Sequence, residues 1–223
     1  HPSWSLQMAR SGAPKLEVMA AELGLEKMDT IAELMQSLLD QSVDWETIKW
    51  VRDLWDGPLI VKGMLDPGEV ASAREVGVDG IVISNHGGRQ LDGSVATIDI
   101  VREFRAQAGP DMTLLVDSGF RTGSDIARAL ALGADAVQVG RATLYALASG
   151  GEEGVRQALS VLKSELEIVQ ILMGARSIGD FNSSMLRCQF PPEKLAEATV
   201  PASQAQPSGS LSLVTDKRQG NRP

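Results

Sequence analysis

The chain has 223 residues, 43% of them hydrophobic and 22% charged, which excludes an intrinsically disordered or fibrous protein. Its net charge of -8 argues against nucleic-acid binding, because binding to phosphates needs a cationic surface. The apolar runs are far shorter than the roughly 20 residues that span a bilayer, so any membrane contact is expected to be peripheral. The single cysteine, Cys188, excludes an intramolecular disulfide and indicates a reducing compartment, the cytoplasm or the inner face of the cell membrane.

The first segment, residues 1–55, differs in composition from the rest of the chain. It holds all four tryptophans and no strand-like run, and an amphipathic pattern runs from Met28 to Leu39. We expect a helical lead-in here. Its first 45 residues combine Trp, Met and Leu with Arg10 and Lys15, which would suit either a membrane-facing insertion or a helix that packs on the main domain.

Residues 56–190 repeat a pattern of strand, glycine-containing turn and helix. Four short apolar runs mark the strands, at Leu59–Lys62, Gly80–Ser84, Thr113–Asp117 and Ala136–Gly140. Helices are expected to begin at Asp66, after Ser94, at Thr122 and after Arg141. Because the runs are continuously apolar, we expect a parallel sheet that is buried on both faces. Residues 191–223 lack aromatic side chains and are expected to form a disordered tail.

Two α/β architectures fit this pattern, an open doubly wound sheet and a (β/α)8 barrel, and in both the chemistry lies at the carboxyl ends of the strands. No G-x-G-x-x-G follows an early strand, whereas polar residues end all four runs, which favours the TIM-barrel type. Four runs are half of the eight that a barrel needs. The chain also begins with His1 instead of Met, so we expect it to hold only the four C-terminal βα units.

The segment Ser84–Gly93 carries the sharpest chemical signal. His86 follows a predicted buried strand within a glycine-rich turn, and Arg89 comes three residues later. Histidine transfers protons near neutral pH, and the arginine fork fits a carboxylate. The pair therefore suits a substrate with a carboxylate beside an ionisable hydroxyl. The competing interpretation is a histidine that stabilises the turn and an arginine on the surface.

Three further positions look functional. Lys62 ends the first strand and is expected to reach the barrel mouth, where it would stabilise negative charge or extend into solvent. The turns Asp117–Ser124 and Gly140–Thr143 combine glycine, arginine and the start of a helix, an arrangement that suits a phosphate. The competing interpretation is that these glycines only turn the chain.

Together these segments resemble a known family. Lys62-Gly63, Ser84–Asp92, Asp117–Arg121 and Gly140-Arg141 are similar, in order and spacing, to the motifs of the FMN-dependent 2-hydroxy acid dehydrogenases and oxidases. Some segments, such as His1–Trp4, look most like the branch that oxidises mandelate. Others, such as Trp55–Pro58, look equally like the branch that oxidises lactate, so the substrate side chain stays open.

The resemblance implies a cofactor, a reaction and a role for each residue. FMN would be bound by Lys62, Ser84, Asp117, Ser118, Gly119, Phe120, Arg121, Gly140 and Arg141. Lys62 would stabilise the reduced flavin ring, His86 would be the base, and Arg89 would hold the substrate carboxylate. The reaction would convert an L-2-hydroxy acid to a 2-oxo acid, with a quinone, a cytochrome or oxygen as electron acceptor. The resemblance also implies a homo-oligomer and, in the mandelate branch, membrane attachment through the segment that corresponds to residues 1–45.

Two alternatives stay open. Other phosphate-binding FMN barrels share glycine-rich loops, although the His86 and Arg89 pair argues against them. A half-barrel could also persist as a non-catalytic associating module. The family's first half supplies a second arginine, substrate-facing tyrosines and an aspartate that orients the histidine. We therefore expect the isolated chain to bind FMN weakly or not at all, and not to turn over.

Overall fold

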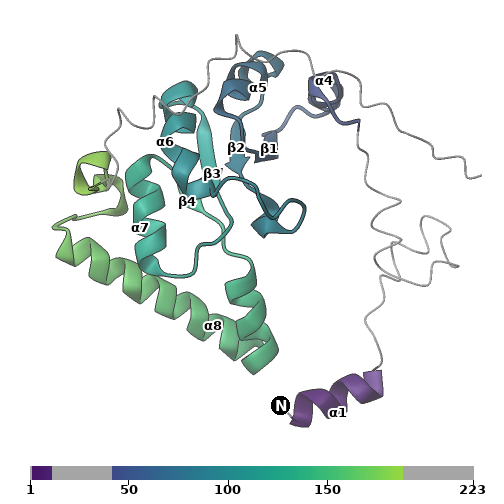
Figure 1. Ribbon diagram of the computed structural model, residues 1–223, viewed down its shortest axis with the longest axis vertical. Coiled ribbons are helices and arrows are strands. Elements are labelled where there is room, and N and C mark those ends of the chain that lie inside the picture. Colours follow the sequence, from purple (N-terminus) through teal and green to yellow (C-terminus); the bar gives the residue numbers. More distant parts are fainter. Residues whose placement is uncertain (1, 12–41, 188–223) are drawn as a thin grey trace, which may run out of the picture.

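The computed structural model describes residues 2–11 and 42–187 of the chain (Figure 1). Its helices are α1 (Pro2–Ser11), α4 (Trp45–Leu54), α5 (Val70–Val76), α6 (Thr97–Ala108), α7 (Gly123–Leu132) and α8 (Arg141–Leu172). Its strands are β1 (Ile60–Met64), β2 (Gly80–Ile83), β3 (Thr113–Val116) and β4 (Ala136–Val137). The expected helix from Met28 to Leu39 and the expected disordered tail at 191–223 lie outside the described residues.

The four strands form one parallel sheet in the order β1-β2-β3-β4. Strand and helix alternate along the chain, so the structure confirms the expected βα units, a partial (β/α) barrel. The fourth strand is shorter than expected, because only Ala136 and Val137 pair with β3. Within the described ranges, no helix combines the length and the apolar character needed to cross a membrane.

The two faces of the sheet have different surroundings. Helices α5, α6 and α7 cover one face, where Ile81, Ile83, Leu114 and Val116 are fully buried around Phe104 (Figure 1). The opposite face carries every second residue of each strand. These residues lie outside the main core, and their burial varies: Val82 is 3% exposed, whereas Ile60 is 46% exposed. The expectation that both faces are buried therefore holds for β2, all of whose residues are buried, and is wrong for β1 and β3. A continuous apolar run indicates a face suited to burial, but it does not supply the neighbours that bury it.

Local capping residues explain where several helices begin. Thr122 forms a capping box with Asp125, which starts α7 where the sequence predicts it. Asp44 caps α4 by accepting hydrogen bonds from the amide and hydroxyl of Thr47, so an Asp with a Thr three residues later marks this helix start in the sequence. Helix α6 begins at Thr97, later than expected, because the Asn85 side chain holds the preceding loop through the carbonyl of Val95.

An arginine hub joins the beginnings of β1 and β2. Arg52, on α4, donates hydrogen bonds to the carbonyls of Gly57 and Gly77 and forms an ion pair with Asp79 at 3.0 Å. Asp79 also accepts the amide of Leu59 at 2.7 Å, and its own amide donates to the Leu59 carbonyl. The hub thereby fixes the end of α5 against both strands.

The same hub recurs between β3 and β4. Arg105, on α6, donates to the carbonyls of Gly109 and Gly133 and pairs with Asp135 at 2.8 Å. Asp135 accepts the amide of Leu114 at 2.7 Å, and its own amide donates to the Leu114 carbonyl. The same arginine and aspartate pattern therefore occurs twice, once between β1 and β2 and once between β3 and β4.

Candidate active site

A lysine, a serine and an aspartate meet at the carboxyl ends of three neighbouring strands. Lys62 lies in β1, Ser84 directly follows β2, and Asp117 directly follows β3. The Lys62 Nζ donates to Ser84 Oγ at 2.7 Å and pairs with Asp117 Oδ2 at 2.7 Å. Lys62 and Asp117 occupy equivalent positions, each three residues beyond a leucine whose amide donates to a hub aspartate. The repeat thus places an ion pair at the expected site.

This arrangement keeps Asp117 ionised. Burial of its carboxyl raises the pKa, but the hydrogen bonds from Lys62, Ser118 and Ser84 and the charge of Lys62 outweigh it and hold the pKa of Asp117 below its usual value. The Asp117 side chain is 18% exposed, whereas that of Lys62 is 43% exposed. The ammonium therefore keeps an open side toward the uncovered face of the sheet.

His86 lies on a tight turn that is held by hydrogen bonds to the side chains of Ser84 and Asn85. Its amide donates to Ser84 Oγ at 3.1 Å, while the Asn85 side chain accepts the amides of Gly87 and Gly88. His86 has φ 55°, a left-handed conformation that is uncommon outside glycine and concentrates at functional sites. The imidazole itself is turned toward β1. A Cβ on Gly63 would lie 2.8 Å from His86 Nε2, and the φ of 104° at Gly63 also favours glycine next to Lys62.

Two further loops meet the His86 turn at Gly87. The amide of Gly87 donates to Ser118 Oγ at 3.0 Å, and its carbonyl accepts from Arg141 Nη2 at 2.7 Å. Ser118 has φ 78°, the second left-handed non-glycine residue in the described part of the chain. The loops after β2, β3 and β4 are therefore joined at one point. The structure brings together Lys62, Ser84, His86, Asp117, Ser118 and Arg141 from the expected site.

The remaining predicted residues are placed less closely. Arg89 and Arg121 are exposed, and in the described ranges their guanidinium groups have no hydrogen-bond or ion-pair partner. Phe120 is 6% exposed and packs in the main core, so only its backbone is free to meet a cofactor. The site also contains residues to which the sequence analysis gave no role. Asn85 shapes the histidine turn, and Thr97 donates to the Asp117 carbonyl at 2.5 Å. The Asn at the start of a glycine-rich turn is a signal that could have identified the first of them.

The two loops that are expected to bind phosphate differ in whether their backbone amides already donate to acceptors within the protein. At the start of α7, Asp125 accepts the amides of Arg121 and Thr122, and Glu165 accepts that of Gly123. At the start of α8, Gly140 provides no side-chain cap. Space is open around Gly119 and Gly140, where an added Cβ would meet no atom within 4 Å. At the start of α8 the amide of Thr143 donates to the Gly140 carbonyl, and in the described part of the chain the amides of Arg141 and Ala142 are available for an anion.

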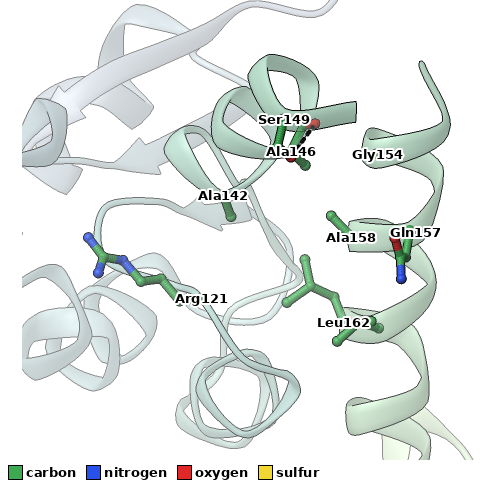
Figure 2. Close-up of a pocket in the computed structure, with 9 residues that line it drawn as sticks. Arg121, Ala142, Ala146, Ser149, Gly154, Gln157, Ala158 and Leu162 are labelled. Atoms are coloured by element: carbon green, nitrogen blue, oxygen red, sulfur yellow. Dashed lines mark hydrogen bonds between the residues drawn. The ribbon is translucent and has the colours of Figure 1, made fainter. Parts of the chain in front are cut away.

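A cavity of about 320 Å³ lies apart from this cluster, between the two segments of α8 that Gly150 and Gly151 separate (Figure 2). Its walls are mostly small apolar side chains. In Figure 2 the guanidinium of Arg121 points away from Ala158 and Leu162, so the arginine contributes only its aliphatic stem. The cavity is distinct from the site around Lys62 and His86.

Comparison with known proteins decides the family. The model of the FMN-dependent dehydrogenase family matches residues 1–188. The chain belongs to the FMN-dependent dehydrogenase family. The resemblance carried by the motifs is thereby confirmed.

Relatives within the family include enzymes that act on lactate and on mandelate. The L-lactate dehydrogenase of Yersinia pestis (strain Pestoides F) is 43% identical over 190 residues, which cover 83% of this chain and 49% of that protein. The crystal structure of the monotopic membrane protein (S)-mandelate dehydrogenase has a TM-score of 0.75 at 40% identity and covers 84% of this chain and 49% of that chain. A soluble mutant of the membrane-associated (S)-mandelate dehydrogenase from Pseudomonas putida has a TM-score of 0.64 at 40% identity, covering 73% and 48%. The chain thus spans about half the length of the relatives it matches.

Proposed function

We propose that this chain supplies the base, the carboxylate clamp and the phosphate site for the FMN-dependent oxidation of an L-2-hydroxy acid to a 2-oxo acid. The observation that carries the proposal is the convergence of Lys62 and the His86 turn on the hydroxyl of Ser84. A cation and a proton acceptor lie together at the carboxyl ends of parallel strands, where barrels of this type hold their chemistry. The family match supports the same reaction class.

The residues present fit FMN. The uncapped start of α8 offers backbone amides to a phosphate, and the open space at Gly119 and Gly140 lets a ligand approach the backbone. The free guanidinium of Arg121 would add a second cationic group beside that phosphate, and Lys62 would face the ring from β1. When bound, FMN accepts the electron pair that leaves C2 of the substrate. Arg141 already donates to Gly87, so it would hold the histidine turn as well as the cofactor.

Oxidation of a 2-hydroxy acid also releases two protons, and His86 is placed to take one of them. Its turn is fixed by Ser84 and Asn85, and its ring lies over Gly63, next to Lys62. Whether His86 takes the hydroxyl proton or the proton on C2 depends on the substrate pose. Arg89 lies on the same loop with an exposed guanidinium, suited to a two-pronged contact with the substrate carboxylate.

Because the chain spans about half of its relatives, we propose that activity belongs to a barrel completed by further strands, and that the chain alone binds FMN weakly. The test is a chimera of residues 1–188 with the half of the Yersinia pestis L-lactate dehydrogenase that this chain does not match. The chimera should bind FMN and oxidise L-lactate or (S)-mandelate with an artificial electron acceptor, and Arg89→Lys should raise KM more than it lowers kcat. A chimera that binds FMN but oxidises neither acid would overturn the proposal.

A peripheral membrane contact through residues 1–45 is a separate proposal. It is supported by the related (S)-mandelate dehydrogenase, which is described as a monotopic membrane protein. Residues 12–41 lie outside the described part of the chain, and the composition of residues 1–45 is the second support for the proposal. Flotation of the chimera with anionic liposomes, compared with a chimera that lacks residues 1–41, tests it. Equal flotation of the two proteins would contradict it.

A further inference from the structure

We infer that Ser118 is a positioning residue, whose hydroxyl fixes the His86 turn relative to the ion pair of Lys62 and Asp117. The inference rests on the proposed function for the role of His86. It assigns to the Ser118 hydroxyl a task within the protein that differs from the cofactor contact that the family resemblance implies.

The hydrogen-bond directions at Ser118 follow from the chemistry of its partners. Its Oγ lies 2.6 Å from Asp117 Oδ1, and because an ionised carboxylate only accepts, the serine hydroxyl must donate there. The lone pairs of Oγ then face the amide of Gly87, which donates to them at 3.0 Å. The other carboxylate oxygen of Asp117 binds the Lys62 ammonium at 2.7 Å. The charge of the ion pair thereby orients the hydroxyl that receives the histidine turn.

A second connection closes this network into a ring. Lys62 also donates to Ser84 Oγ, which accepts the amide of His86. The amide on each side of the His86 α-carbon is therefore tied, through one serine hydroxyl, to the same ion pair. Ser84 makes this connection from β2, and Ser118 makes it from β3. Two anchors on different strands restrict the rotation of the turn far more than one anchor on its own strand does.

The backbone of Ser118 supports a role for its side chain. Its φ of 78° is left-handed, a conformation that costs a non-glycine residue roughly 1–2 kcal/mol. Glycine would adopt it without that cost. A serine at such a position is consistent with a hydroxyl that compensates the strain through its bonds to Asp117 and Gly87.

The hydrogen bond from Gly87 to Ser118 fixes where the turn lies in the protein. It is not needed for the turn to keep its local shape. Gly87 also donates to the Asn85 side chain at 3.0 Å, and Gly88 donates to the same oxygen. The turn therefore keeps its local hydrogen bonds when the Ser118 hydroxyl is removed. What it loses is its attachment to the loop after β3, so His86 gains freedom relative to Lys62.

Two substitutions distinguish the effect of removing the Ser118 hydroxyl from the effect of relieving its left-handed backbone. Ser118→Ala and Ser118→Gly both remove the hydroxyl, but alanine keeps the left-handed strain and glycine relieves it. The chain has only two histidines, so NMR of histidine-labelled protein resolves His86 with His1 as an internal reference. In both variants we expect the same change in the His86 ring signals and on the order of tenfold faster hydrogen exchange at Gly87. The exposed Ser164→Ala is the control and should change neither.

Kinetics of the chimera complete the test. Both Ser118 variants should lower kcat on the order of tenfold with FMN content retained, while glycine gives the more stable protein of the two. A wild-type kcat in Ser118→Gly would overturn the inference, because the hydroxyl would then not be needed to position His86. Loss of FMN from both variants would overturn it in favour of a cofactor ligand. If the unsubstituted chimera is inactive, the proposed function fails, but the NMR and exchange data still decide the positioning role.

Discussion

Replacement of Asp117 by asparagine tests the ion pair at the centre of the site. Asp117→Asn keeps the size of the side chain and one oxygen for the Ser118 hydroxyl, but it removes the charge that faces Lys62. A hydrogen bond to a charged group contributes about 1.5–3 kcal/mol, and an exposed ion pair about 0.2–1 kcal/mol. The Lys62 side chain is 43% exposed, so solvent screens the pair. We therefore expect Asp117→Asn to lower the free energy of unfolding by about 1–2 kcal/mol at neutral pH.

The pH dependence of this difference has a definite sign. The pKa of Asp117 in the folded protein lies below its ordinary value of 3.8. Its charge therefore contributes stability that is fully present above pH 3.8 and is lost as the pH falls through the lowered pKa. Asparagine does not titrate, so the gap between the two proteins should close as the pH falls below 3.8.

Urea unfolding of the chain at neutral and acid pH measures this gap. Tryptophan fluorescence reports the transition, because Trp45 packs against the main core. The matched control is Asp53→Asn, the same chemical change at an exposed aspartate of α4, which should leave the free energy of unfolding unchanged at both pH values. The reasoning would be refuted if the two proteins had the same free energy of unfolding at neutral pH, or if their difference were unchanged below the lowered pKa.

Four other substitutions test the structure of the domain around the site. Arg105→Met and Arg52→Met should each lower the free energy of unfolding by about 3 kcal/mol, because each substitution leaves several carbonyl oxygens without a donor. A large effect at only one of the two positions would contradict the equivalence of the two hubs. Gly63→Ala would place a methyl group 2.8 Å from His86 Nε2 at a φ of 104°, so it should shift the His86 ring signals in NMR, and unchanged signals would refute the packing of the ring on β1. Gly123→Ala would place Cβ against the backbone nitrogen of Leu166, so it should destabilise the protein by about 1–3 kcal/mol and lower the melting temperature. An unchanged Tm would show that α7 and α8 are not in contact there.

The sequence predicts the positions of the site residues because each apolar run ends in a polar residue. Lys62, Ser84 and Asp117 follow from that pattern, and the parallel pairing of the strands then brings them together. The role of Ser118 could not be predicted in the same way. Its bond to Gly87 joins residues 31 positions apart and depends on a left-handed backbone that the serine itself does not indicate.

The arginine hubs and the uncovered face of the sheet are two further features that could not be predicted from the sequence. Arg52 and Arg105 look like ordinary charged residues of amphipathic helices, and the glycine and aspartate that each one binds at the next helix end and strand start lie 25 to 30 positions away. The apolar pattern of the strands indicates which residues favour burial, but it does not reveal how many neighbouring strands are present. The helix-covered face follows the pattern, and the exposure of Ile60 departs from it.

Anaerobic mixing of the FMN-loaded chimera with an L-2-hydroxy acid tests the central claim, that His86 carries the proton transfer, most directly. The visible absorbance of the flavin should bleach with L-lactate or (S)-mandelate. In His86→Asn the FMN content should be retained, and bleaching should slow by about 10²–10⁴-fold, the usual contribution of a positioned base. Bleaching of His86→Asn at the rate of the unsubstituted chimera would contradict the account.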